Sequence, residues 1–160
     1  MEFCKRLFRS VLIAVPAMVM TSELVASPAS VANALSGMRV LVIEDIWIVA
    51  QSYVALLDNL GVIVSGPAGT VAEAMSLIER RIDRGATPID AALVDMNLGG
   101  EMAYGVIDAL NARGVPVVVV TGCDVEPEFA LKVSGFLKKP IRAEALIKAL
   151  RGIAATTATT

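Results

Sequence analysis

The 160-residue sequence contains no histidine. Without an imidazole the chain cannot supply a Ser-His-Asp or Cys-His catalytic group, a phosphohistidine or a histidine ligand of zinc. Its two cysteines, Cys4 and Cys123, are too few for a disulfide framework or a cysteine metal cluster, so we expect both to be free reduced thiols. The formal net charge of −2 and the pI near 5.2 lack the basic excess typical of direct nucleic-acid binding.

The first 37 residues differ from the rest of the chain. Three basic residues within positions 5–9 precede an apolar run at 11–20, and an Ala-x-Ala pattern follows at 32–34. This is the layout of a secretory signal, and the run is short for a transmembrane helix. Either the segment is an export or anchoring signal, or translation starts at Met38, directly before the first expected strand. We favour the start at Met38 and expect residues 1–37 to lie outside the fold.

From Met38 onward, short apolar runs alternate with segments of helical periodicity, and glycine or proline marks most of the joints. Five strands are expected near 39–43, 62–65, 91–95, 117–120 and 135–137, and four helices near 49–60, 70–82, 104–113 and 142–151. This alternation predicts an α/β fold, a doubly wound parallel sheet with helices on both faces. The stretch 124–134 holds only a thin helical pattern, around 128–133, and we expect 154–160 to be a disordered tail.

Four of the apolar runs end in polar residues. Asp95 ends the central run, Glu44-Asp45 follows the first run, and Thr121-Gly122 and Lys139-Pro140 follow the last two. Because the carboxyl ends of parallel strands meet at one edge of a sheet, we expect these side chains to face one another there.

Three neighbouring carboxylates repel one another unless a cation neutralises them, and hard oxygen ligands suit Mg²⁺. Taken singly, each residue has a structural explanation: Glu44-Asp45 could cap a helix, Thr121 is common at strand ends, and Lys139 could be a counter-ion. Pro140 favours an extended Lys139, which would aim the ammonium along the sheet edge. Together the residues predict a magnesium-assisted phosphoryl site with Asp95 as the nucleophile.

This set of residues, on the first, third, fourth and fifth strands, resembles the receiver domain of two-component response regulators (CheY-like domains). The resemblance covers residues 38–153 and implies a flavodoxin-like sheet with strand order 2-1-3-4-5. It also implies that a histidine kinase's phosphohistidine phosphorylates Asp95.

The resemblance further implies roles for the remaining site residues. Mg²⁺ would be held by Glu44, Asp45, Asp95 and the main-chain carbonyl of Asn97. Thr121 and Lys139 would contact the phosphoryl group. Thr121 would move toward that group and Phe136 would reorient with it, which amounts to a population shift between two conformations.

The chain departs from the family pattern in three places. Asn97-Leu98-Gly99-Gly100 replaces the usual Met-Pro after the phosphorylated aspartate, which we expect to loosen the following loop. Phe136 replaces the frequent tyrosine and has no hydroxyl. Thr121-Gly122-Cys123 and the thin fourth helical pattern are similar to a receiver subgroup with a Thr-Gly motif and an atypical fourth helix.

The expected function is that of a stand-alone receiver that signals by phosphorylation-dependent protein contact. It would not be an enzyme beyond its own phosphoryl transfer and slow autodephosphorylation. Its partners would be a histidine kinase and a downstream protein, with homodimerisation left open and no direct contact to nucleic acid. We expect it in the cytoplasm, where kinases meet ATP, and at a membrane only if residues 1–37 are a real anchor.

Other functions remain open or are disfavoured. The domain could act as a phosphate sink or as a phosphorylation-independent scaffold (a pseudo-receiver). A Mg²⁺-dependent phosphohydrolase is disfavoured, because Asn97 stands where haloacid-dehalogenase-type enzymes need a second acid. A nucleotide-binding domain is excluded, because neither G-x-G-x-x-G nor G-x-x-x-x-G-K-[ST] occurs.

Overall fold

The computed structural model of the chain describes residues 34–83, 88–122 and 131–157. Five parallel strands form one sheet in the order β2-β1-β3-β6-β7. Their bounds are β1 Arg39–Ile43, β2 Ile63–Ala68, β3 Ala91–Asp95, β6 Val117–Thr121 and β7 Gly135–Lys138. Because β4 and β5 belong to a separate hairpin, this is the predicted order 2-1-3-4-5, and the flavodoxin-like α/β fold is confirmed.

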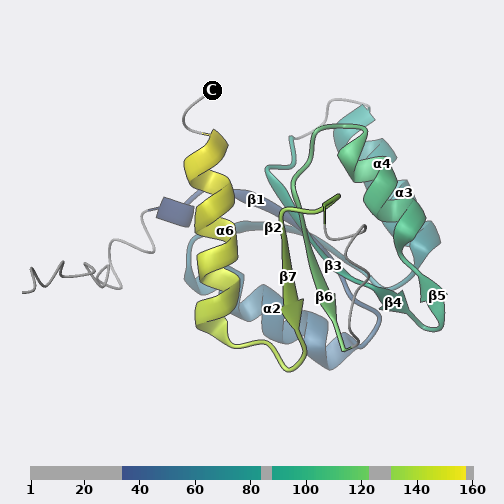
Figure 1. Cartoon of the computed structure of the whole chain (residues 1–160), viewed down its shortest axis with the longest axis horizontal. Coiled ribbons are helices and arrows are strands. Elements are labelled where there is room, and N and C mark those ends of the chain that lie inside the picture. Colours follow the sequence, from purple (N-terminus) through teal and green to yellow (C-terminus); the bar gives the residue numbers. More distant parts are fainter. Residues whose placement is uncertain (1–33, 84–87, 123–130, 158–160) are drawn as a thin grey trace, which may run out of the picture.

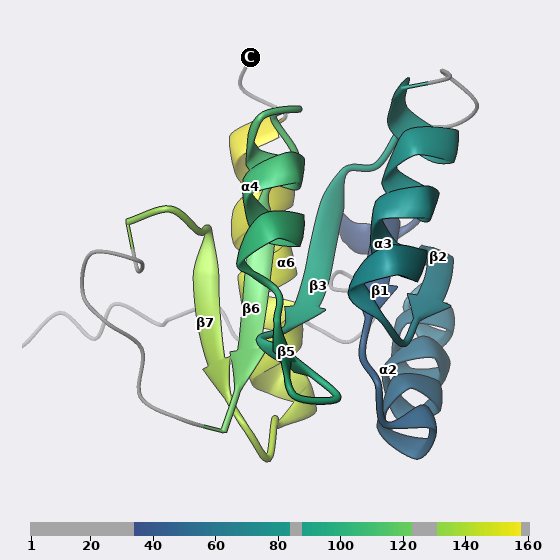
Figure 2. The ribbon, with the colours of Figure 1, turned by 90° about the vertical axis from the view of Figure 1, so that its right-hand side faces the viewer.

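Helices cover both faces of this sheet (Figures 1 and 2). They are α2 Trp47–Asn59, α3 Val71–Ile78, α4 Tyr104–Asn111 and α6 Ala143–Thr157, and a π-helical turn η1 at Glu79–Asp83 continues α3. Helices α3 and α4 lie together on one face, while α2 and α6 lie on the other. Among the described residues, no helix is both long and apolar enough to cross a bilayer.

The strand sequences divide the core into two layers. Successive side chains of a strand point to opposite faces, so Leu41 and Ile43 pack beneath α3 and α4, whereas Val40 and Val42 pack beneath α2 and α6. The same alternation runs through β3 and β6, which are buried along their whole length. Aliphatic residues at every position of these strands are what a sheet covered on both faces requires.

The amino-terminal boundary of the fold lies upstream of the one expected at Met38. Leu35 is fully buried in the layer beneath α2 and α6. Two backbone hydrogen bonds hold its turn: the Met38 N–H donates to the Leu35 carbonyl at 3.0 Å, and the Gly37 N–H to the Gly61 carbonyl at 2.8 Å. Residues 34–37 are therefore part of the fold, while 1–33 lie outside the described residues.

The carboxyl-terminal boundary also needs correction. Helix α6 continues past Ile153 to Thr157, so residues 154–157 are helical rather than a disordered tail. The hydroxyls of Thr156 and Thr157 donate to the carbonyls of Gly152 and Ile153, one turn earlier, at 3.0 and 2.8 Å. Ala154 also packs against the core, which adds apolar contact to this last turn.

Two further findings concern helical segments. The sequence Thr70-Val71-Ala72-Glu73 at the start of α3 has the form of a capping box, which forms on one side only. Thr70 Oγ1 accepts from the Glu73 N–H, but Glu73 Oε2 accepts from the Gly69 N–H, one residue before the cap. The thin helical pattern at 128–133 falls mostly outside the described residues, as do both cysteines.

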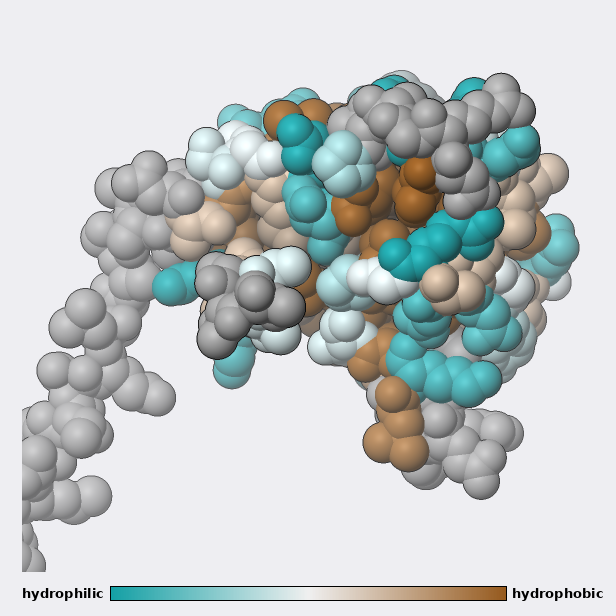
Figure 3. Space-filling model, turned by 90° about the horizontal axis from the view of Figure 1, so that it is seen from above, coloured by the Kyte–Doolittle hydropathy of each residue, from teal (hydrophilic) through white to brown (hydrophobic). Residues whose placement is uncertain are grey.

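The end of the molecule at which the strands begin does not hold the expected site residues. Its coloured surface intersperses hydrophilic and hydrophobic residues (Figure 3). A shallow hollow there is lined by Pro116, Ser134, Gly152 and Thr156, which are small or uncharged. The titratable site expected from the sequence lies at the other end.

Candidate functional site

The structure places the predicted site residues at the carboxyl edge of the sheet. Asp95 and Thr121 are the last residues of β3 and β6, Glu44 and Asp45 follow β1, and Lys139 follows β7. The parallel register aligns Ile43 with Val94, Asp95 with Val120, and Thr121 with Lys138, so these strand ends are nearly level.

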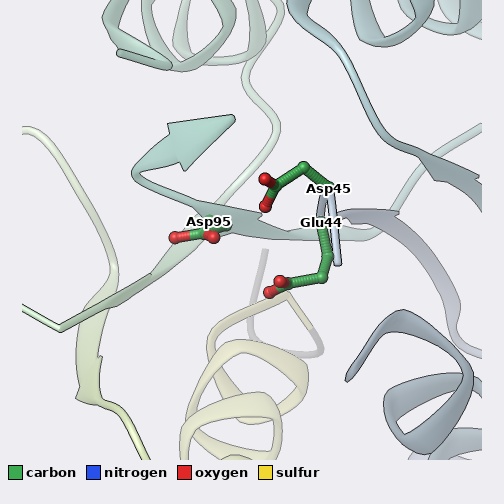
Figure 4. A group of neighbouring side chains, drawn as sticks. All are labelled: Glu44, Asp45 and Asp95. Carbon is green, nitrogen blue, oxygen red and sulfur yellow. The ribbon is translucent and has the colours of Figure 1, made fainter. Parts of the chain in front are cut away.

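Three carboxyl groups converge at this edge (Figure 4). One oxygen each from Glu44, Asp45 and Asp95 lies within 4.8 Å of the others. Glu44 and Asp95 are only 2% and 6% exposed, and Asp45 is the least buried of the three. Ionised carboxylates this close together repel one another, and a bound cation would offset that repulsion.

Lys139 supplies a positive charge to the two buried carboxylates. Its Nζ lies 2.8 Å from Oδ2 of Asp95 and 2.9 and 3.1 Å from the two oxygens of Glu44. The Lys139 N–H also donates to the Thr121 carbonyl at 2.8 Å, which anchors the residue to the end of β6. The peptide bond to Pro140 is cis.

The period of two along the strands explains which side chains meet. Glu44, Asp95 and Lys139 are in phase with Val42, Leu93 and Leu137, all of which pack beneath α2 and α6. Lys138 is out of phase with these residues and is exposed. The alternation of side chains along the strands therefore places the ion-paired triad of Glu44, Asp95 and Lys139 on the same face of the sheet.

Burial and ion pairing shift the pKa values of Glu44 and Lys139. Burial raises the pKa of Glu44 above 4.5; the hydrogen bond from Lys139 opposes the rise and the charge of Asp95 adds to it. For Lys139, burial lowers the pKa, but hydrogen bonds and negative charges from Asp95 and Glu44 outweigh it, so the pKa is raised above 10.5. Burial, with the charge of Glu44 second, raises the pKa of Tyr53 in α2 to about 12.

Thr121 and Phe136 lie on the other side of the sheet edge. Phe136 pairs in register with Val119 and packs, half-buried, against the layer beneath α3 and α4. Thr121 is in phase with Val119 and is 7% exposed. The two residues predicted to switch together therefore belong to the face opposite the ion-paired triad.

The sequence interpretation missed a hairpin beside the site. Strands β4 Asn97–Leu98 and β5 Glu101–Met102 pair antiparallel around Gly99 and Gly100, whose φ values are +65° and +98°. Positive φ at both turn positions is the geometry of a tight two-residue hairpin turn, and Gly-Gly between the paired residues was the available signal. The segment expected to be a loosened loop therefore forms a paired hairpin.

This hairpin contacts two of the three acidic residues. The Gly99 N–H donates to Oδ2 of Asp45 at 3.0 Å, and the Asn97 N–H lies 3.3 Å from Oδ1 of Asp95. The Gly100 N–H donates to Oδ1 of Asn97 at 2.7 Å, which closes the turn on itself.

Exposed apolar side chains flank the acidic cluster in sequence, another feature the sequence interpretation missed. Ile46, Trp47 and Ile48, directly after Asp45, are 50%, 70% and 64% exposed. Met102 and Tyr104, at the end of the hairpin and the start of α4, are 44% and 47% exposed.

The donor set fits Mg²⁺. Mg²⁺ prefers oxygen ligands, keeps several waters and needs only one or two carboxylates, and Asp45 is open enough to admit solvent. Glu44, Asp45 and Asp95 could share the ion, and the main-chain carbonyl of Asn97 belongs to the hairpin beside them.

Comparison with known proteins supports the fold. No protein-family model matches the chain, and no curated protein matches it. Among solved structures it is similar to a CheY-like response regulator receiver domain from Methylobacillus flagellatus, with 24% identity over 74% of this chain and 99% of that one and a TM-score of 0.64. It is also similar to a sensor protein from Polaromonas, with 27% identity over 74% and 97% and a TM-score of 0.60.

A third similar structure contains a metal. The receiver domain of a sensor histidine kinase from Pseudomonas aeruginosa, solved with a magnesium ion coordinated in its active-site cleft, shares 23% identity over 75% of this chain and 99% of that one, with a TM-score of 0.62. The chain thus has the receiver-domain fold, which confirms the resemblance inferred from its sequence.

Proposed function

We propose that this protein is a phosphorylatable receiver that accepts a phosphoryl group on Asp95 from a histidine kinase and signals by protein contact. One observation carries the proposal. Asp95 is almost fully buried at the end of β3, and its carboxylate lies close to two other carboxylates and to the ammonium of Lys139. An acidic cluster with a fixed ammonium suits transfer of a charged phosphoryl group to a carboxylate.

In the transfer, an Asp95 carboxylate oxygen forms a bond to phosphorus while the phosphorus–nitrogen bond of the kinase's phosphohistidine breaks. The released imidazole takes up a proton from solvent. When bound by Glu44, Asp45, Asp95 and the Asn97 carbonyl, Mg²⁺ would neutralise negative charge on the phosphoryl oxygens and the acidic cluster.

Lys139 and Thr121 would bind the phosphoryl product, which carries about −1.5 to −2 charges. The Lys139 ammonium already contacts Asp95 and needs only to exchange Glu44 for a phosphoryl oxygen. The Thr121 hydroxyl would donate to another phosphoryl oxygen, and its movement would let half-buried Phe136 reorient on the face covered by α3 and α4.

Signalling would then depend on a second protein that distinguishes the two conformations. The donor kinase requires ATP, which places the exchange in the cytoplasm. We do not propose catalysis of any reaction on a separate substrate.

The test is the intact mass of the full-length protein after incubation with acetyl phosphate, a small phosphodonor. We expect one phosphoryl adduct that requires both Mg²⁺ and Asp95: absent in Asp95→Asn and retained in Asp58→Asn, which changes an exposed aspartate of α2. If a folded protein gains no adduct from acetyl phosphate or from a phosphorylated kinase, the receiver function is refuted and a scaffold role is favoured.

A further inference from the structure

The β4–β5 hairpin reaches the acidic cluster through its backbone. The Gly99 N–H donates to Oδ2 of Asp45 at 3.0 Å, although 54 positions separate the two residues. Asp45 is the least buried of the three acids and follows the end of β1, so core packing does not restrain its carboxylate as it restrains Glu44 and Asp95.

The turn geometry makes this N–H available. Leu98 and Glu101 pair across the hairpin, and Gly99 and Gly100 form the turn with φ values of +65° and +98°. A turn residue outside the strand pairing can direct its N–H away from the ladder, and in this hairpin the Gly99 N–H meets a carboxylate. The Gly100 N–H, by contrast, is used within the hairpin, by Asn97 Oδ1.

We propose that Gly99 is a positioning residue for Mg²⁺: its N–H holds one oxygen of Asp45 so that the other is available to an ion shared with Glu44 and Asp95. This inference rests on the proposed receiver function and on the fit of the acidic cluster to Mg²⁺. Hydrogen bonds that orient a metal-binding carboxylate commonly set affinity, and their loss costs about 10- to 100-fold.

The proposal also concerns metal selectivity. Mg²⁺ requires nearly ideal octahedral geometry, whereas Ca²⁺ accepts variable geometry and longer bonds. A hydrogen bond that fixes Asp45 should therefore matter more for Mg²⁺ than for Ca²⁺. A hairpin that only stabilised the fold would affect both ions equally.

The test removes the donor without adding a side chain. In the full-length protein, glycolic acid replaces Gly99, so that an ester oxygen stands in place of the N–H. The same replacement at Gly100 is the matched control, because that N–H does not contact Asp45. Dissociation constants for Mg²⁺ and Ca²⁺ come from NMR titration of backbone amides.

We expect the Gly99 ester to weaken Mg²⁺ binding about tenfold, with a clearly smaller loss for Ca²⁺ and an unchanged melting temperature. The Gly100 ester should bind Mg²⁺ like the unmodified protein. Unchanged or tighter Mg²⁺ binding by the ester, or equal losses for the two ions, would overturn the proposal. If the unmodified protein binds no Mg²⁺ at this edge, the magnesium site of the proposed function itself fails, which is a distinguishable result.

Discussion

The Nζ of Lys139 lies 2.8 Å from Oδ2 of Asp95 and also contacts both oxygens of Glu44, so one ammonium forms ion pairs with the two most buried acids of the chain's described part. The same lysine would later bind the phosphoryl group, which connects the stability of the domain to its proposed function. Replacing it therefore has two separable effects.

The first prediction is that Lys139→Ala lowers the free energy of unfolding by about 3 kcal/mol at neutral pH without Mg²⁺, because two buried carboxylates lose their counter-ion. Since the pKa of Lys139 is raised in the fold, this stabilisation is present below its ordinary pKa of 10.5 and is lost above it. Denaturant unfolding of the variant and of Lys148→Ala, an exposed lysine of α6, measures the effect.

The same variant should still bind Mg²⁺, since it keeps all three carboxylates, and saturating Mg²⁺ should recover much of the lost stability. It should also fail to change conformation on phosphorylation. Spectral changes like those of the unmodified protein would contradict this role of Lys139.

The second prediction concerns Glu44→Gln. Because the pKa of Glu44 is raised above 4.5, the fold favours its protonated form, and the ionised form costs stability at neutral pH. The neutral amide should therefore raise the denaturation midpoint at pH 7 without Mg²⁺ while weakening Mg²⁺ binding. The gain should shrink as pH falls and vanish below 4.5. Glu144→Gln in α6 serves as the control, and a destabilised Glu44→Gln would contradict the prediction.

The third prediction is that Leu35→Ala lowers the free energy of unfolding by about 3 kcal/mol, because a fully buried leucine leaves a cavity. Leu131→Ala, at a side chain 89% exposed, should change it by less than about 0.5 kcal/mol. A chain that begins at Met38 should lose as much stability as Leu35→Ala relative to one that begins at Ala34. Equal stability of the two truncated chains would show that Leu35 contributes nothing.

The fourth prediction uses Trp47, the single tryptophan of the chain and the first residue of α2. It follows Asp45 by two positions, so an ion bound at Asp45 should alter its fluorescence in a saturable way. The response should be strongly reduced in Asp45→Asn and preserved in Asp58→Asn. Identical titration curves for the two variants would show that the fluorescence of Trp47 does not report ion binding at Asp45.

Local sequence patterns were sufficient for most of the architecture. The uninterrupted aliphatic runs of β1, β3 and β6 predicted a sheet buried on both faces, and their polar ends predicted the acidic edge. The alternation of side chains along a strand also places Lys139 on the same face of the sheet as Glu44 and Asp95. These features follow from residues adjacent in sequence, since parallel strands bring their carboxyl ends together in any such fold.

The buried face of α2 does not follow from its apolar spacing alone. Apolar residues recur at helical spacing at Val49, Tyr53, Leu56 and Leu60, whereas the fully or nearly buried residues are Ala50, Tyr53 and Leu57. The helix is apolar on several sides, so its own periodicity does not identify the face that packs. Contact with the sheet determines it, and leaves Trp47 and Ile48 exposed.

The sequence by itself determined which residues stand at the ends of the strands, because that depends on local order along the chain. Only the tertiary structure decided that Leu35 enters the core, that Gly99 donates to Asp45, and that Lys139 bridges two acids at once. Each of these contacts joins positions far apart in sequence or depends on where a turn directs one N–H. No periodic pattern encodes them, since a single buried leucine or a single backbone donor has no repeat by which to be recognised.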